Sequence, residues 1–194
     1  MSRLRRTGRC NHRRLGTSIF GRANPDLDKN GLPFLPRSTL TWIDQYGDQD
    51  KKGFVEYFRQ TPTGLAQQGW KDCYDLAFHA DGTIAEGPIA LCEVPGYVYA
   101  AKRAASHSAR LLEYPERAES LLLEAQPLRH QINRQFWSDE LGTYIVTLGG
   151  GEKPCAIRST NATHTLCTEI VTQDQAEHMV KGFFEEEFLP AIQI

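Results

Sequence analysis

Two apolar stripes at helical spacing leave this chain few folds to choose from. The first stripe follows Pro88 and the second follows Pro115. Apolar residues that recur every three or four positions form one face of an amphipathic helix, and proline is favoured as the first residue of a helix. The sequence therefore predicts two long helices that begin at these prolines and pack as an antiparallel hairpin. The stripes consist of Leu91, Val94, Val98, Ala101 and Ala105, and then of Ala118, Leu121, Leu122, Ala125, Leu128, Ile132 and Phe136.

Each stripe also contains an internal proline, Pro95 in the first and Pro127 in the second. A proline inside a helix lacks the backbone N–H group and clashes with the preceding turn, at a cost of about 3 kcal/mol. We therefore expect both helices to be bent or interrupted at these positions.

Weaker signals complete the fold. Ser38 can cap a short helix that contains Leu40, Trp42, Ile43 and Tyr46. Residues 143–148 alternate as in a strand and are followed by three glycines, which predicts a small β-hairpin. Residues 162–167 and 173–184 are expected to be helical. The predicted fold class is mainly all-α, made of antiparallel helical hairpins joined at one end by a long loop.

Composition narrows the classes of protein. A chain of 194 residues suits one domain with a sizeable core. A net charge of −2 gives no general attraction to nucleic acid or to a membrane surface, and no apolar run approaches the roughly 20 residues that a transmembrane helix needs. The five cysteines form no pair or Cys/His set at metal-ligand spacing. We therefore expect reduced thiols, a cytoplasmic location, no metal and no cofactor.

The first part of the chain differs from the rest. Seven arginines precede the first acidic residue, Asp26, and apolar residues do not recur periodically there. We interpret residues 1–36 as a leader, disordered or irregular, and residues 37–194 as the folded domain.

The segment from Gln67 to Asp75 has the densest chemistry. It sets Asp72 and Asp75 among Trp70, Tyr74 and side-chain amides. Hydrolysis of a glycosidic bond needs two carboxyl groups and flat apolar faces for the sugar ring. A carboxyl group packed against an aromatic ring loses solvation, which raises its pKa. On spacing alone, a solvated acidic loop remains the alternative.

A second acidic segment begins at Asp48 and resembles a calcium-binding loop, with Asp48, Asp50, Gly53 and Glu56 at similar spacing. Lys52 stands where the third carboxylate ligand would be, so a cation occupies the place of a ligand oxygen. We expect a polar turn without calcium.

Four segments in this order resemble the bacterial amylo-alpha-1,6-glucosidase-like (glycogen-debranching) glycoside hydrolases, which are six-hairpin glycosidases. The resemblance extends from about Leu40 to about Ile170. It implies an (α/α)6 barrel with long active-site loops, here incomplete. The segments are Thr41-Trp42-Ile43-Asp44, Gly64-Leu65-Ala66-Gln67-Gln68-Gly69-Trp70-Lys71-Asp72, Phe78-His79-Ala80-Asp81-Gly82 and Ala85-Glu86-Gly87-Pro88-Ile89-Ala90-Leu91-Cys92-Glu93-Val94.

The resemblance implies inverting hydrolysis of alpha-glucosidic bonds in a glucan or oligosaccharide. The position that matches the general acid is Asp75, with Asp72 as the weaker candidate. The positions that match substrate-binding residues are Trp70, Lys71, His79, Glu86, Glu93, Arg158, Asn161 and His164. For Glu93 and His164 a structural role, as a cap or a hydrogen-bonded polar group in the core, is an equal alternative.

In this family the general base lies on a later hairpin than those matched here. We therefore expect a fragment of a catalytic barrel that is inactive alone, with apolar helix faces that favour self-association. The alternatives are a non-catalytic carbohydrate-binding protein and a truncated product without function.

Overall fold

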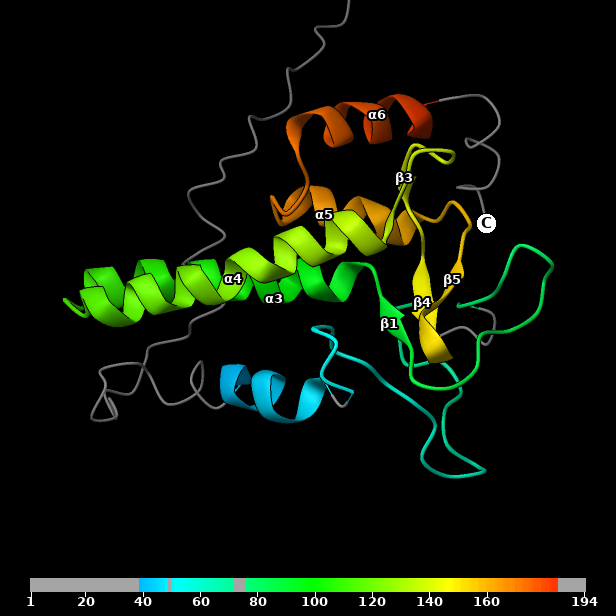
Figure 1. The fold of residues 1–194 in the computed structure, drawn as a ribbon, viewed down its shortest axis with the longest axis horizontal. Coiled ribbons are helices and arrows are strands. Elements are labelled where there is room, and N and C mark those ends of the chain that lie inside the picture. Colours follow the sequence, from blue (N-terminus) through cyan, green and yellow to red (C-terminus); the bar gives the residue numbers. More distant parts are fainter. Residues whose placement is uncertain (1–38, 49, 72–75, 185–194) are drawn as a thin grey trace, which may run out of the picture.

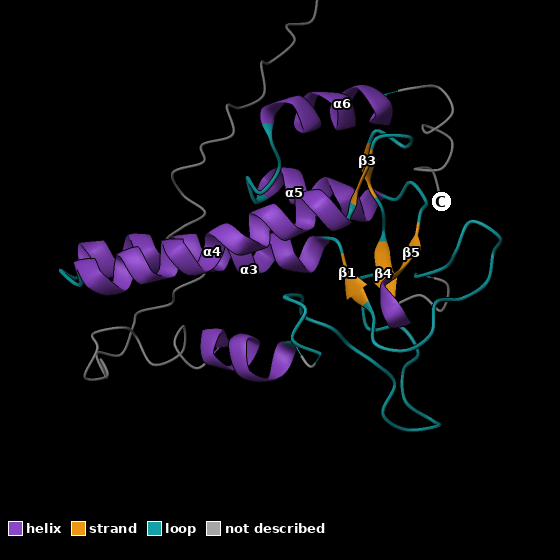
Figure 2. Cartoon of the chain, in the orientation of Figure 1, coloured by secondary structure: helices purple, strands orange, loops and turns teal. Residues whose placement is uncertain are grey.

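The computed structural model describes residues 39–48, 50–71 and 76–184, so the predicted leader 1–36 lies outside the described residues. This part of the chain is mainly helical with a few short antiparallel strands (Figures 1 and 2). Two long helices, α3 (Glu93–Leu111) and α4 (Pro115–Gln135), lie side by side as a hairpin. The prediction of two long helices is confirmed, with Pro115 as the first residue of α4.

Small buried side chains line the contact between α3 and α4. Ala109 packs against Ala118, and Ala105 packs against Leu121. The hydroxyl group of Ser106 donates a hydrogen bond of 2.7 Å to the carbonyl oxygen of Ala118. Small side chains allow close approach of two helices, and close packing maximises dispersion contacts.

The predicted start of the first helix at Pro88 is wrong, because α3 begins at Glu93. Ile89 instead exchanges two backbone hydrogen bonds with Tyr57, of 2.8 and 3.0 Å, and the next residues form strand β1 (Ala90–Leu91). Their backbone groups are therefore satisfied by a sheet rather than by a helix. As a result, Pro95 lies in the first turn of α3, where N–H groups have no partner within the helix and proline is tolerated.

Of the bend or interruption predicted at Pro127, the interruption is wrong, because α4 continues to Gln135. Pro127 and Leu123 are both exposed. Water can therefore hydrogen-bond the carbonyl group of Leu123, which loses its usual donor four residues later. The helix thus tolerates proline on its solvent side.

The predicted strand at residues 143–148 is confirmed in two pieces. Strand β3 (Thr143–Tyr144) pairs with β2 (Trp137–Ser138), and β4 (Thr147–Gly149) pairs with β5 (Lys153–Cys155). The three-stranded sheet has the order β1-β4-β5 and is antiparallel, with Ala90 opposite Leu148. The hairpin between β4 and β5 turns through Gly151, whose φ of 71° favours glycine.

The last helices follow the sheet. A 3-10 turn, η3 (Thr160–Ala162), leads directly into α5 (Thr163–Cys167), and α6 (Gln173–Phe183) begins with a capping box at Thr172. The helices predicted at residues 162–167 and 173–184 are confirmed. Met179 of α6 closes the core formed with Phe136 and Tyr144.

The short N-terminal helix predicted after Ser38 is also present. It covers residues 39–42 and continues as a π-helical turn, η1 (Ile43–Gly47), on one side of the α3–α4 hairpin (Figure 1). Leu40 packs against Ala105 and Leu121. The buried ammonium group of Lys102 lies 2.7 Å from Asp44 and 3.2 Å from Glu124, so an ion pair links this helix to both long helices.

We expect the Lys102→Met substitution to lower the free energy of unfolding by about 2 kcal/mol. A charge that loses a buried partner costs up to several kcal/mol, and here the partial exposure of Asp44 and Glu124 reduces that cost. The control is Arg103→Met, since Arg103 pairs with Glu169 at the surface and should cost less than about 1 kcal/mol. Denaturant unfolding of both variants tests this. Equal losses would show that the ion pair with Asp44 does not hold the N-terminal helix.

Candidate functional site

Three aromatic side chains from distant parts of the chain meet at the surface. The ring centroid of His164 lies 5.0 Å from that of Trp70 and 5.9 Å from that of Tyr97. The hydroxyl group of Tyr97 lies 2.5 Å from Nδ1 of His164. Trp70 is 55% exposed and Tyr97 is 43% exposed. We call Trp70, Tyr97 and His164 the aromatic cluster.

Two glycines allow the cluster to form. A side chain at Gly96 would bring a Cβ atom to 2.8 Å from the hydroxyl oxygen of Thr168, so glycine lets the first turns of α3 approach the end of α5. A side chain at Gly69 would overlap Leu76, so glycine also lets the loop that carries Trp70 pack closely. The chain therefore uses two glycines to bring α3, α5 and the loop together.

Beneath the cluster lies a buried carboxyl group. Glu93 is 1% exposed, and its Oε1 accepts a hydrogen bond of 2.8 Å from the side-chain amide of Asn161. The thiol of Cys92 donates to Oε2 over 3.5 Å. Burial raises the pKa of Glu93, and the hydrogen bonds that it accepts offset part of this shift. Glu93 lies one helical turn before Tyr97 in α3, and Asn161 lies one turn before His164. Their hydrogen bond therefore links the two segments that carry these rings.

Lys71 adds a positive charge at the rim. Its ammonium nitrogen lies 5.7 Å from the ring centroid of Trp70, which is cation–π distance. The structure thus brings together five of the predicted site residues, namely Trp70, Lys71, Glu93, Asn161 and His164.

Other predicted residues have different surroundings. Nδ1 of His79 lies 3.1 Å from the carbonyl oxygen of Pro154 and 3.4 Å from the sulfur of Cys155. The Glu86 side chain is exposed, and its carbonyl oxygen accepts a hydrogen bond from Gly150. Arg158 donates to the carbonyl oxygen of Leu141 over 3.1 Å. The predicted general acid Asp75 and its alternative Asp72 lie outside the described residues.

A second polar group is centred on Tyr57, whose surroundings include Glu93 and Cys155. The hydroxyl of Tyr57 donates a hydrogen bond of 2.6 Å to the amide oxygen of the buried Gln67. Burial is the main cause that raises the pKa of Tyr57 to about 12, with smaller contributions from the negative charges of Glu93 and Cys155. Burial also raises the pKa of the Cys155 thiol to about 11, which keeps it protonated near neutral pH and makes it a poor nucleophile.

The segment that resembles a calcium loop is closed by its own backbone. The Asp48 carboxylate accepts hydrogen bonds from the N–H groups of Lys52 and Gly53, at 3.0 and 2.9 Å, and the Lys52 ammonium pairs with Asp50 at 2.9 Å. Lys52 therefore neutralises a carboxylate that calcium would need. Within residues 39–48, 50–71 and 76–184, no cluster of three His, Cys, Asp or Glu residues is arranged to hold a metal ion.

The sequence matches no protein-family model and no curated protein. Among the helices of the described part of the chain, none combines the length and apolarity that crossing a membrane requires.

The aromatic cluster can bind a ring that has both apolar and polar surfaces. The exposed face of Trp70 offers apolar contact, and the imidazole and phenol groups offer hydrogen bonds at its side. This combination of flat apolar faces and oriented polar groups is typical of small-ligand sites.

Sequence reasoning missed Tyr97. It belongs neither to the apolar stripe of α3 nor to the segments that carry the family resemblance. The signal that could have found it is its spacing, because an aromatic residue four positions after Glu93 lies on the same face of a helix.

We expect Glu93→Gln to change how stability depends on pH. Because the pKa of Glu93 is raised in the folded state, its contribution to stability is complete below the ordinary value of 4.5 and is lost as pH rises through the higher folded-state pKa. Glutamine stays neutral and keeps an acceptor for Asn161. The variant should therefore gain stability relative to wild type as pH rises from about 4 to 8.

The measurement is the melting temperature by circular dichroism across this pH range. Glu169→Gln serves as the control, because it removes a carboxylate that is 73% exposed. A difference between wild type and Glu93→Gln that does not vary with pH would contradict the raised pKa.

Proposed function

We propose that the aromatic cluster binds a glucan or oligosaccharide, and that this chain forms part of an inverting glycoside hydrolase that acts on alpha-glucosidic bonds. The observation that carries the proposal is the meeting of Trp70, His164 and the Glu93–Asn161 pair at one place. These residues come from three separate segments, and the family resemblance implies substrate-binding residues in each of them.

The proposed architecture is an incomplete (α/α)6 barrel in which α3 and α4 form one hairpin. In support, the cluster lies where the loop, the start of α3 and α5 meet, at one end of this hairpin (Figure 1). Helical hairpins that present substrate residues at one end are compatible with that architecture, in which loops carry the chemistry and helices hold them.

We assign the role of general acid to Asp75, five residues after Trp70 in the sequence. Inverting hydrolysis also needs a second carboxylate, about 6.5–9.5 Å from the acid, to activate water. Among the described residues, Glu93 is the carboxyl group beneath the aromatic cluster. Both of its oxygens are hydrogen-bonded and it is 1% exposed, so it cannot bring water to a sugar. Glu93 acts instead as a positioning residue for Tyr97 and Asn161.

We expect Trp70→Ala to weaken binding of maltooligosaccharides about tenfold, since loss of one stacking ring removes about 1.4 kcal/mol. The matched control is Trp42→Ala, because Trp42 is also 55% exposed but lies on the N-terminal helix. Affinity electrophoresis in glycogen and calorimetry with maltoheptaose measure the effect. Equal losses in the two variants, or no binding by wild type, would remove the support for a sugar site at the cluster.

We expect the purified chain not to release glucose from isomaltose, maltose or a limit dextrin. The resemblance implies that the water-activating carboxylate lies on a later hairpin, and Glu93 is too buried to replace it, so several kcal/mol of transition-state stabilisation should be missing. Asp75→Asn is the control. Turnover that this substitution abolishes would show that a water-activating carboxylate lies within the chain, which would contradict the proposal.

A second candidate is non-catalytic carbohydrate binding. The burial of Glu93 favours it, because the aromatic cluster can bind a sugar without any reactive carboxylate. Glycogen binding that is lost in Trp70→Ala, together with no turnover and no effect of Asp75→Asn on binding, is the result that this candidate predicts.

A further inference from the structure

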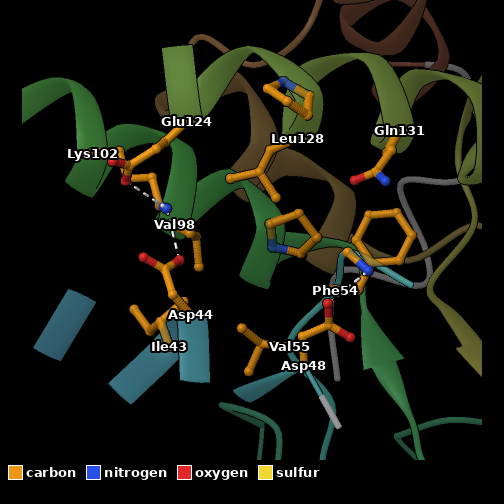
Figure 3. A pocket seen from close by; sticks show the side chains of 13 residues that line it. Ile43, Asp44, Asp48, Phe54, Val55, Val98, Lys102, Glu124, Leu128 and Gln131 are labelled. Atoms are coloured by element: carbon orange, nitrogen blue, oxygen red, sulfur yellow. Dashed lines mark hydrogen bonds and ion pairs between the residues drawn. The ribbon is translucent and has the colours of Figure 1, made fainter. Parts of the chain in front are cut away.

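A hollow of about 240 Å³ lies between the N-terminal helix, the following loop and the α3–α4 hairpin (Figure 3). The hollow is partly open to solvent, so a ligand can enter it. Its apolar wall includes Phe54, Val98 and Leu128, and its polar wall includes Lys102 and Gln131. We call it the helix-seam cavity.

The helix-seam cavity is separate from the aromatic cluster. Val98 and Lys102 line the cavity, whereas Tyr97 belongs to the cluster and Glu93 lies beneath it. The corresponding positions are five residues apart on α3, which places them about 140° apart around the helix. The two candidate sites therefore use opposite sides of the same helix.

Three carboxylates and one ammonium group line the cavity, and each already has a partner. Lys102 pairs with Asp44 and Glu124, and Glu124 also accepts a hydrogen bond of 2.7 Å from Arg117. The carboxylate of Asp48 accepts two hydrogen bonds from backbone N–H groups. Because each charge already has a partner, a fully charged ligand would have to displace an existing interaction.

The remaining hydrogen-bonding capacity suits hydroxyl groups. The ammonium group of Lys102 has three donors and uses two of them on Asp44 and Glu124. The third can donate to a ligand oxygen, while the carboxylate of Asp44 and the amide of Gln131 can accept from ligand hydroxyls. Figure 3 shows Lys102 between the two carboxylates, with Val98 and Leu128 beside them. A ligand here needs an apolar face and several hydroxyl groups.

We propose that the helix-seam cavity binds a neutral polyhydroxylated ring of monosaccharide size. The volume of 240 Å³ is below the range of about 300–1,000 Å³ for drug-sized ligands, so it suits one ring rather than a chain. Lys102, which is 4% exposed, is the buried donor that fixes the ring, and Phe54 and Leu128 contact its C–H face. This proposal does not depend on sugar binding at the aromatic cluster.

The test is NMR of the full chain, with methyl α-D-glucopyranoside as the ligand and the methyl groups of Val98, Val55 and Leu128 as reporters. We expect saturable shifts of these methyl signals with a dissociation constant on the order of 1 mM, as is usual for a ligand of this size. The absence of shifts at concentrations up to about 50 mM, well above that constant, would overturn the proposal. Shifts with methylammonium or acetate but not with the glucoside would overturn the ligand class.

Leu128→Trp fills the cavity and should weaken binding at least tenfold, read from the Val98 and Val55 signals. The matched control is Leu123→Trp, because Leu123 is 59% exposed on the same helix and does not line the cavity. Melting curves of both variants establish that they fold. Asp44→Asn, which keeps the shape but removes an acceptor charge, gives a second test that does not depend on bulk. Unchanged binding in both Leu128→Trp and Asp44→Asn would overturn the location.

The two binding proposals can be tested independently of each other. Trp70→Ala should leave the Val98 and Val55 shifts unchanged, and Leu128→Trp should leave binding of maltoheptaose unchanged. Shifts at the cavity that disappear in Trp70→Ala would show that one site accounts for both effects, which would overturn the helix-seam proposal.

Discussion

The burial of Glu93 constrains much of this structure. A carboxyl group taken out of water is costly unless hydrogen bonds compensate it. The chain provides that compensation from Asn161, 68 residues later, and so connects the start of α3 to the turn before α5. Because α5 follows this turn directly, the same hydrogen bond also sets the place of His164. The hydrogen bond that the buried Glu93 needs therefore helps to position side chains of the aromatic cluster that come from distant segments.

Helix α3 contributes residues to both candidate sites. Its start is fixed by the antiparallel pairing of β1 with β4, and its far side packs against α4 along alanine and leucine side chains. One face then supports the aromatic cluster while another lines the helix-seam cavity. A helix that is packed on several sides cannot rotate without losing all of these contacts. The positions of the two sites relative to each other are consequently set by a single rigid element.

Some of this fold was predictable from the sequence. The apolar stripe after Pro115 predicted α4 with its correct first residue, because proline and periodicity agreed. The start of α3 was misplaced, since Leu91 is buried whether it lies in a strand or a helix and the stripe cannot distinguish them. The ion pair of Lys102 was not predictable from the sequence, for a different reason. Its partner Asp44 lies 58 residues away, and nothing local marks a lysine as buried. Within the site, Trp70 was predictable from a sequence motif. Its contact with His164 was not, because the two residues are far apart in the sequence.

The aromatic cluster also shows how a half-exposed ring can be ready for a ligand. A free surface tryptophan would lose rotational freedom on binding, which subtracts from the affinity. Here His164 contacts the ring of Trp70, the Lys71 ammonium lies over it, and Tyr97 is hydrogen-bonded to His164 from α3. The entropic cost of ordering these side chains arises during folding, through the packing around Glu93. A ligand would therefore meet a surface that is already arranged. If the cluster binds a ligand, as proposed, pre-organisation of this kind would offset part of the cost of burying polar groups beneath it.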